Sequence, residues 1–130
     1  MRKIIVLLSL LLFSMALHAA DKSPSEIFME YHSALKRSFS TRTVMPFHSQ
    51  AFITRFEEKF PADMRDRAFY IMKTGAPKKV EIQESEIQGD RALLKVVSVD
   101  EHPQMRGNVR LILEDGVWKV DEVEWIRDEV

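Results

Sequence analysis

The 130-residue sequence contains no cysteine, and this absence removes several kinds of site at once. No disulfide can stabilise the fold, no thiolate can bind a metal ion, and no cysteine can act as a nucleophile or carry a lipid anchor. The chain must therefore rely on its apolar core. The composition supplies one, since 45% of the residues are hydrophobic and eight are phenylalanine.

Motifs that mark familiar catalytic and nucleotide-binding sites are also missing. The four glycines form neither a phosphate loop nor a nucleotide-binding fingerprint, and nothing resembles a serine triad. Glu81, Glu84 and Glu86 are evenly spread, which is typical of a charged strand edge rather than of a hydrolytic carboxylate pair. We therefore expect no cofactor and no catalytic residue of a recognisable class.

A surplus of basic residues is absent as well. The chain carries 19 Lys and Arg against 20 Asp and Glu, and two of the basic residues, Arg2 and Lys3, lie at its N-terminal end. Without residues 1–20 the net charge falls from −1 to −3 with histidine counted neutral. Nucleic acids and anionic lipids both favour a basic surface, so neither is an expected partner.

Residues 1–20 have the three-part layout of a secretory signal peptide. Two basic residues open the chain, residues 4–12 are apolar except for one serine, and Ala19 and Ala20 precede a charged pair. This apolar stretch is shorter than the about 20 residues that a membrane-spanning helix needs. We predict cleavage after Ala19 or Ala20, release into the periplasm without a membrane span, and one mature domain over residues 21–130.

Three helices are predicted between Ser23 and Gly75. Ser23, Pro24 and Glu26 fit a capping box at the start of the first helix, which should end near residues 38–41. Pro46 and Pro61 interrupt helical spacing, so we place a second helix at 50–60 and a third from there to Gly75. Apolar stripes define the helices: Ile27, Phe28, Tyr31, Leu35 and Phe39; then Phe52, Ile53, Phe56 and Phe60; then Met64, Ala68, Ile71 and Met72.

From Lys79 onward the apolar spacing changes from helical to alternating, which indicates strands. Gly89-Asp90 and Asp115-Gly116 lie between alternating runs and predict two tight hairpins. Trp118 and Val120 share one parity whereas Val123 and Trp125 have the other, so we predict a bulge at Asp121-Glu122. The expected fold class is α+β, with N-terminal helices packed in the concavity of a strongly curved antiparallel sheet.

Three segments resemble the nuclear-transport-factor-2-like superfamily, in particular its small exported bacterial members: Pro24–Phe28, Gly89–Ala92 and Asp115–Val120. The resemblance implies a cone in which helices fill the concavity of a curved sheet, as in the cystatin-like arrangement, with a pocket at the open end. Members include isomerases, dehydratases, scaffolds, transport factors and binding proteins, so the fold does not select a function. The isomerase branch uses a buried Asp base with a Tyr and a protonated Asp, and that set cannot be placed on this sequence.

Three histidines remain after removal of the signal peptide. His32 lies at the border of the first apolar stripe, and we expect it on the surface. His48 lies in an irregular segment, where it could border a pocket or cap the following helix. His102 follows two acidic residues, but neighbours in sequence rarely converge on one ion, so we predict a solvated loop and no metal site.

The aromatic residues supply the other candidates for a binding site. Most should form the core between helices and sheet, with Tyr31 or Tyr70 as the polar group of an open apolar pocket. Arg110 would offer an anion site if it faced the concave side, although a solvated position is the simpler interpretation. The candidate ligand-binding residues are Tyr31, Phe47, His48, Phe52, Phe56, Tyr70, Arg110 and Trp118.

The sequence favours a non-catalytic exported binding or accessory protein, because no set of acid, base and nucleophile can be assembled from it. Its partner would be a small apolar ligand or a protein, as for an immunity or adaptor protein. The enzymatic alternative is an isomerase- or dehydratase-like protein with His48 or His32 as a base and Tyr31 or Tyr70 as a donor. A third hypothesis is a homodimer formed through the sheet face.

Overall fold

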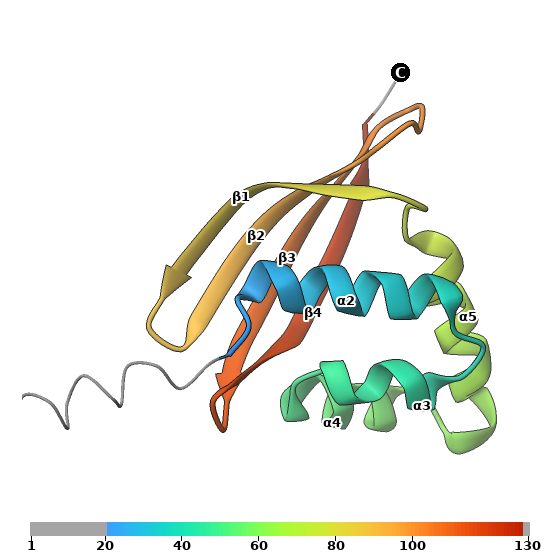
Figure 1. Ribbon diagram of the computed structural model, residues 1–130. Helices are drawn as coiled ribbons and strands as arrows, with labels where there is room; N and C mark the ends of the chain where they lie inside the picture. Colours follow the sequence, from blue (N-terminus) through green and yellow to red (C-terminus); the bar gives the residue numbers. More distant parts are fainter. Residues whose placement is uncertain (1–20, 129–130) are drawn as a thin grey trace, which may run out of the picture.

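The computed structural model describes residues 21–128, in which helices cover the concave face of a four-stranded antiparallel sheet (Figure 1). This arrangement confirms the predicted α+β class, whereas the predicted signal peptide lies outside the described residues. The helices are α2 (Pro24–Arg37), α3 (Thr41–Val44), α4 (Gln50–Lys59) and α5 (Arg65–Gly75), and the strands are β1 (Val80–Gln88), β2 (Arg91–Ser98), β3 (Met105–Glu114) and β4 (Val117–Arg127).

Helix α2 begins and ends where its capping residues predict. The Ser23 hydroxyl oxygen accepts a hydrogen bond from the Glu26 backbone N–H at 3.1 Å, and Pro24 occupies the first turn. The helix ends at Arg37 because Ser38 adopts an extended conformation. Phe39 therefore lies outside the helical repeat and is 95% exposed, so its assignment to the apolar stripe was wrong.

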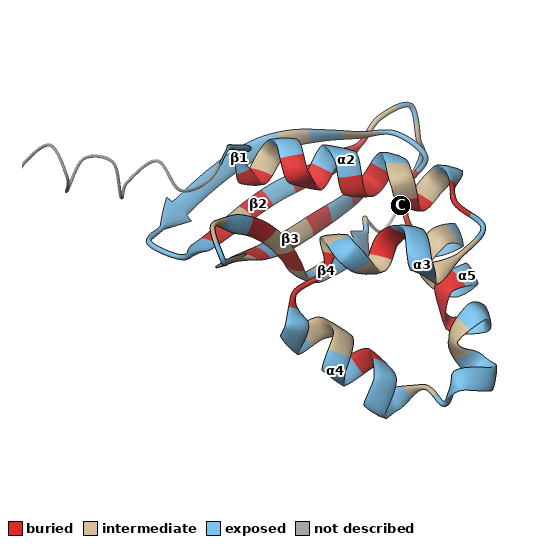
Figure 2. Ribbon diagram, turned by 60° about the horizontal axis from the view of Figure 1, so that its bottom comes forward, coloured by how far each residue is buried: buried red, intermediate tan, exposed pale blue. Residues whose placement is uncertain are grey.

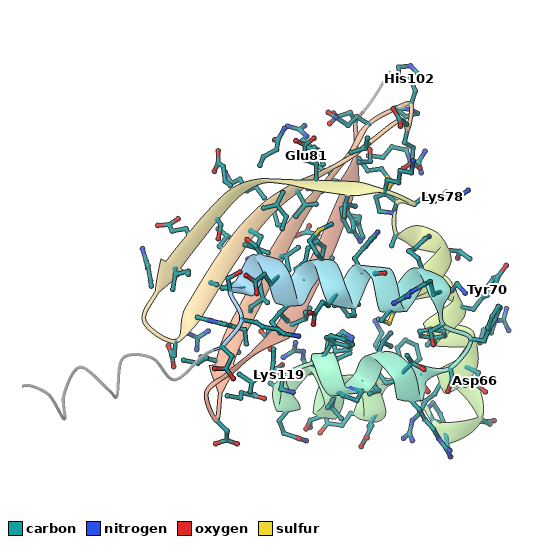
Figure 3. All side chains as sticks on the ribbon, in the orientation of Figure 1. Asp66, Tyr70, Lys78, Glu81, His102 and Lys119 are labelled. Atoms are coloured by element: carbon teal, nitrogen blue, oxygen red, sulfur yellow. The ribbon has the colours of Figure 1, made fainter. Side chains whose placement is uncertain are left out.

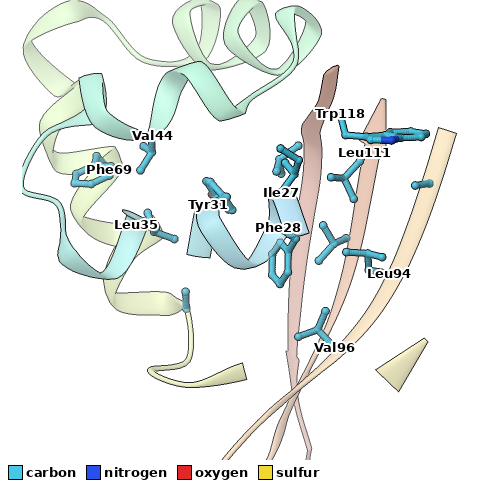
Figure 4. Close-up of a cluster of buried hydrophobic side chains, with 14 residues drawn as sticks. Ile27, Phe28, Tyr31, Leu35, Val44, Phe69, Leu94, Val96, Leu111 and Trp118 are labelled. Atoms are coloured by element: carbon cyan, nitrogen blue, oxygen red, sulfur yellow. The ribbon is translucent and has the colours of Figure 1, made fainter. Parts of the chain in front are cut away.

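The core lies between α2 and the concave face of β2, β3 and β4 (Figures 2 and 4). Phe28 of α2 is fully buried there, together with Leu94, Val109 and Val120 of the sheet. Burial of these side chains is the main source of stability, at about 1.5–3 kcal/mol for each large apolar side chain.

Helix α5 buries a face that matches the predicted stripe only in part. Ala68 is buried as predicted and Phe69 is buried as well, whereas Ile71 is 63% exposed and Met64, which precedes the helix, is 45% exposed. Phe69 joins the cluster that contains Val44 of α3, because α5 packs at the end of the helical layer (Figure 4). The contact with α3, rather than helical spacing alone, selects the buried face.

The sheet is a simple meander in the order β1-β2-β3-β4, joined by the predicted turns. Gly89 has a φ of 60°, and Asp115 and Gly116 have φ values of 50° and 78°. These left-handed conformations suit Gly and Asp, because they avoid or tolerate the Cβ clash that other residues meet. The hairpin prediction is confirmed.

The predicted bulge in β4 is present and re-aims the end of the strand. Arg110 pairs with Glu122 but the next residue, Leu111, pairs with Val120, so Asp121 is the extra residue. Because an extra residue reverses the parity of all later positions in the strand, Val123 and Trp125 join the concave face. Both pack against the core cluster.

Two lysines join the C-terminal ends of α2 and α5. The Lys36 ammonium donates to the carbonyls of Lys73 and Ala76 at 2.9 and 2.8 Å, and the Lys73 ammonium donates to the Ser38 carbonyl at 2.6 Å. The last carbonyls of a helix have no partner within the helix itself, so each lysine supplies a bond that a helix end lacks.

We expect Lys36→Met to lower the free energy of unfolding by about 1–2 kcal/mol, because two charge-assisted bonds are lost at a half-buried position. Arg37→Met is the matched control, since the neighbouring Arg37 is exposed and bonds to Ser33 of its own helix. Its loss should stay below about 0.5 kcal/mol. Urea unfolding of the two variants checks this, and equal losses would contradict it.

Candidate functional site

Two adjoining hollows lie on the concave side of the molecule. We call the first the inner cavity; it has a volume of about 230 Å³ and is lined by Tyr31, His32, Leu35, His48, Phe52, Ile71, Met72, Gly75, Val123 and Trp125. The second, the outer groove, has about 510 Å³ and runs between α4, α5 and β4. Phe52, Ile71, Met72 and Val123 line both, so the two hollows form one continuous site. Its size is that of ordinary small-molecule sites.

Backbone pairing with β4 holds His48 in the site. His48 forms a bridge with Val120, and the next N–H, that of Ser49, donates to the Val120 carbonyl at 2.9 Å. Ser49 also caps α4, since its hydroxyl oxygen accepts from the Phe52 N–H at 3.0 Å. The same hydroxyl donates to the carboxylate of Asp121, the bulge residue, at 2.7 Å. The start of α4 and the bulge therefore form one unit, and Ser49 takes the capping role considered for His48.

The His48 imidazole is buried among aromatic rings, and no described residue meets the geometry of a hydrogen bond with either ring nitrogen. Its side chain stacks on Phe52 with ring centroids 3.8 Å apart, and the edge-on Tyr31 ring is 4.9 Å away. The residue is only 3% exposed, and among residues 21–128 neither Nδ1 nor Nε2 finds a partner. An unpaired buried polar group is destabilising, by about 1–3 kcal/mol. Such a cost is often tolerated where a ligand completes the bonds.

Burial also sets the charge of this group. It lowers the pKa of His48 to about 4, although the Val120 backbone and the Asp121 carboxylate act in the opposite direction. Burial raises the pKa of the Tyr31 hydroxyl. At neutral pH the inner cavity therefore contains a neutral imidazole and a protonated phenol, and it suits an uncharged hydrogen-bonding group.

We expect the protein to lose stability as the pH falls from about 6.5 to about 4. The folded-state pKa of His48 lies below its usual value of 6.5, so in this window the unfolded state binds a proton that the folded state does not. The loss from His48 is about 3 kcal/mol, and it is complete near pH 4. Burial lowers the pKa of His32 as well, which adds in the same direction.

Urea unfolding at pH 7.5 and 4.5 measures this effect. In His48→Leu the difference between the two pH values should shrink markedly. The control is His102→Leu, because His102 is exposed in the loop between β2 and β3 (Figure 3). An equal pH dependence in wild type and His48→Leu would show that His48 is not responsible.

His32 also borders the inner cavity, so its predicted surface position was wrong. It is 5% exposed, its Nε2 has no partner within the described chain, and its ring lies 6.2 Å from that of Trp125. The prediction failed because the end of β4 covers this border of α2. The bulge brings Trp125 there, which helical spacing within α2 cannot indicate.

Trp125 and Gly107 form a feature of the site that sequence reasoning missed. They are paired across β3 and β4, and a Cβ added at Gly107 would lie 2.7 and 3.0 Å from two carbon atoms of the Trp125 ring. Glycine thus leaves the space that the Trp125 indole ring occupies beside β3. The sequence did contain one indication of this contact. The apolar alternation of β4 changes parity at Asp121, which predicts that Trp125 lies on the concave face of the sheet.

The remaining candidates separate into three groups. Tyr31, His48 and Phe52 line the inner cavity, and Phe52 and Phe56 line the outer groove, so these four candidates belong to the same site. Phe47 and Trp118 pack with the core. Tyr70 is 64% exposed on the outer side of α5 (Figure 3), and Arg110 lies on the outer face of the sheet, where it pairs with Glu122 at 2.9 Å.

Residues 21–128 contain neither a cluster of metal-ligating side chains nor a helix that could span a membrane. No group of three or more His, Asp or Glu side chains in this range could hold a metal ion. His102 lies exposed in the loop between β2 and β3. None of the helices in the same range is long and apolar enough to cross a membrane.

The sequence matches no protein-family model and no curated protein. Crystal structures of two bacterial proteins are among those with a similar fold. A candidate NTF2-like transpeptidase from Campylobacter jejuni has a TM-score of 0.58 and 20% identity, covering 78% of this chain and 99% of that one. An NTF2-like protein of unknown function from Shewanella baltica OS155 has a TM-score of 0.55 and 15% identity, covering 91% and 98%. Together with the helix-filled curved sheet and its concave cavity, these similarities show that the chain has the nuclear-transport-factor-2-like (NTF2-like) fold.

Proposed function

We propose that this protein is a binding module that holds a small, mainly apolar molecule in the inner cavity and outer groove. The observation that carries the proposal is the buried His48 imidazole, which lines the cavity with both nitrogens unpaired among the described residues. Small-molecule sites combine aromatic walls with a few polar groups of this kind. A ligand with one neutral hydrogen-bonding group would satisfy His48 while its apolar part contacts Phe52 and Trp125.

We also propose that the protein acts in the periplasm after removal of residues 1–20. The proposal rests on the layout of that segment, with its basic start, its short apolar stretch and its terminal small residues. An N-terminal sequence beginning near Asp21 in a periplasmic extract would support it. Retention of Met1 on protein from the same extract would contradict it.

Native mass spectrometry of protein from a periplasmic extract tests the binding proposal. We expect a small additional mass on the wild type, a loss of that mass in His48→Leu, and its retention in Tyr70→Leu, since Tyr70 lies outside the site. A wild type that carries no additional mass, and shows no stabilisation by any member of a panel of small apolar compounds, would contradict the proposal.

An enzymatic function has one observation in its favour, namely the approach of His48 and Tyr31 to 4.9 Å between ring centroids in one cavity. A base and a phenolic donor so placed could assist proton transfer in an isomerase- or dehydratase-like reaction. However, a pKa of about 4 makes His48 a weak base, and no described carboxylate is bonded to its ring to stabilise a positive charge. We therefore favour binding; catalytic turnover that is lost in both His48→Leu and Tyr31→Phe would reverse the order.

The homodimer hypothesis concerns the opposite face of the sheet. That face carries the ion pairs Lys95–Glu84 at 3.8 Å, Arg110–Glu122 at 2.9 Å and Arg106–Asp128 at 2.7 Å. Obligate dimers usually bury more apolar surfaces than this. We propose that any sheet-face dimer is weak, and light scattering at increasing protein concentration would show whether the mass stays that of a monomer.

A further inference from the structure

We propose that the ligand is an amphipathic hydroxy acid, with a neutral hydroxyl at the inner cavity, an aliphatic chain in the outer groove and a carboxylate at the solvent end beside Lys59. This inference rests on the proposed binding function and adds the chemical class of the ligand. One continuous site offers three different environments along its length, and each of them favours one part of such a molecule.

The inner end requires an uncharged group that both donates and accepts hydrogen bonds. His48 presents two unpaired nitrogens, and Nε2 of the neighbouring His32 is unpaired among the described residues as well. A neutral imidazole has one donor and one acceptor nitrogen. A hydroxyl matches this pair in either direction, whereas a carboxylate would only accept and would be poorly solvated among Tyr31, Phe52 and Trp125.

The middle of the site requires an extended apolar chain. Phe52, Phe56 and Phe60 follow one side of α4 with neighbouring ring centroids 6.0 and 5.2 Å apart. Ala68 and Met72 line the outer groove from α5. From Phe52 to Phe60 the helical rise is about 12 Å, which sets the length of the chain that the wall can contact.

The outer end favours a negative charge. Four charged residues border the outer groove. Three of them already have partners, namely Arg55 with Asp121 at 3.5 Å and Glu122 with Arg110 at 2.9 Å, and the fourth is Lys59. Lys59 is exposed and forms no ion pair with any described residue, and its ammonium lies 5.5 Å from the centre of the Phe60 ring. It is the cation available to a ligand carboxylate.

Three probes of one chain length separate the two polar ends: 10-hydroxydecanoate, decanoate and 1,10-decanediol. Isothermal titration calorimetry should rank 10-hydroxydecanoate as the tightest. Decanoate should bind about tenfold more weakly because it leaves the imidazole unpaired. The diol should bind about threefold more weakly, since an exposed ion pair adds little.

Two substitutions assign these differences to residues. His48→Leu should abolish the preference for 10-hydroxydecanoate over decanoate, and Lys59→Gln should abolish its preference over the diol. Lys95→Gln, an exposed lysine on the outer face of the sheet, is the control and should change neither preference.

The outcomes distinguish the ligand class from the binding function itself. Equal binding of decanoate would overturn the hydroxyl assignment, and equal binding of the diol would overturn the carboxylate assignment. A different small molecule bound in native spectra, without binding of any probe, would overturn the hydroxy acid while leaving the binding function in place. If no probe binds and native spectra of the wild type show no added mass, both proposals fail.

Discussion

Replacing Phe28 by alanine is expected to lower the free energy of unfolding by about 3–5 kcal/mol. Phe28 is fully buried where α2 meets the sheet, and its ring lies 6.2 and 5.9 Å from those of Tyr31 and His32. Its removal costs the transfer energy of the ring and leaves a cavity that the rigid sheet cannot fill. Domains of this size are stable by about 5–15 kcal/mol, so much of the variant could be unfolded at 37 °C.

Phe39→Ala is the matched control because it makes the same chemical change at a position that is 95% exposed. The Lys73 ammonium lies 4.4 Å from the centre of the Phe39 ring, and losing this contact should cost less than about 1 kcal/mol. Urea unfolding followed by tryptophan fluorescence measures both variants. Comparable losses would contradict a core centred on Phe28.

The second large effect is expected for Gly107→Val. A Cβ at this position would lie 2.7 Å from a carbon atom of the Trp125 ring, so the indole must leave the sheet surface or the strands must separate. Such overpacking costs about 1–3 kcal/mol, and displacement of Trp125 also removes one wall of the inner cavity. We expect both a lower unfolding midpoint and a loss of the additional mass in native spectra.

Gly75→Ala provides the comparison, because a Cβ at Gly75 would meet nothing within 4 Å although this residue also lines the inner cavity. Its stability should change by less than about 1 kcal/mol. The double variant Gly107→Val with Trp125→Leu tests the cause, since a smaller side chain removes the clash. If Trp125→Leu lowers the free energy of unfolding by the same amount in the Gly107→Val variant as in the wild type, the two residues are not coupled as we infer.

The site is built from segments that are distant in the sequence. His48 and Ser49 precede α4, yet the Ser49 hydroxyl bonds to Asp121, 72 positions along the chain. The bulge at Asp121 in turn places Trp125 beside His32 of α2. A change at either the bulge or the cap of α4 is therefore expected to disturb the inner cavity as a whole.

The sequence alone determined the features that depend on local conformational preference. The capped start of α2, the turns at Gly89 and Asp115-Gly116, and the bulge at Asp121 follow from backbone preferences and from the two-residue period of strands, and all are present. These signals act over a few residues, so they need no knowledge of distant contacts. The α+β class and the NTF2-like fold followed from their combination.

Only the tertiary structure decided which side chains form the site. His32 was expected on the surface and is buried, Phe39 was expected in the core and is exposed, and Trp125 was no candidate although it lines the inner cavity. Burial depends on which segments cover a residue, and here the covering elements come from β4 and α5. Helical or strand spacing specifies a face of one element, whereas packing between elements specifies whether that face meets solvent, core or cavity.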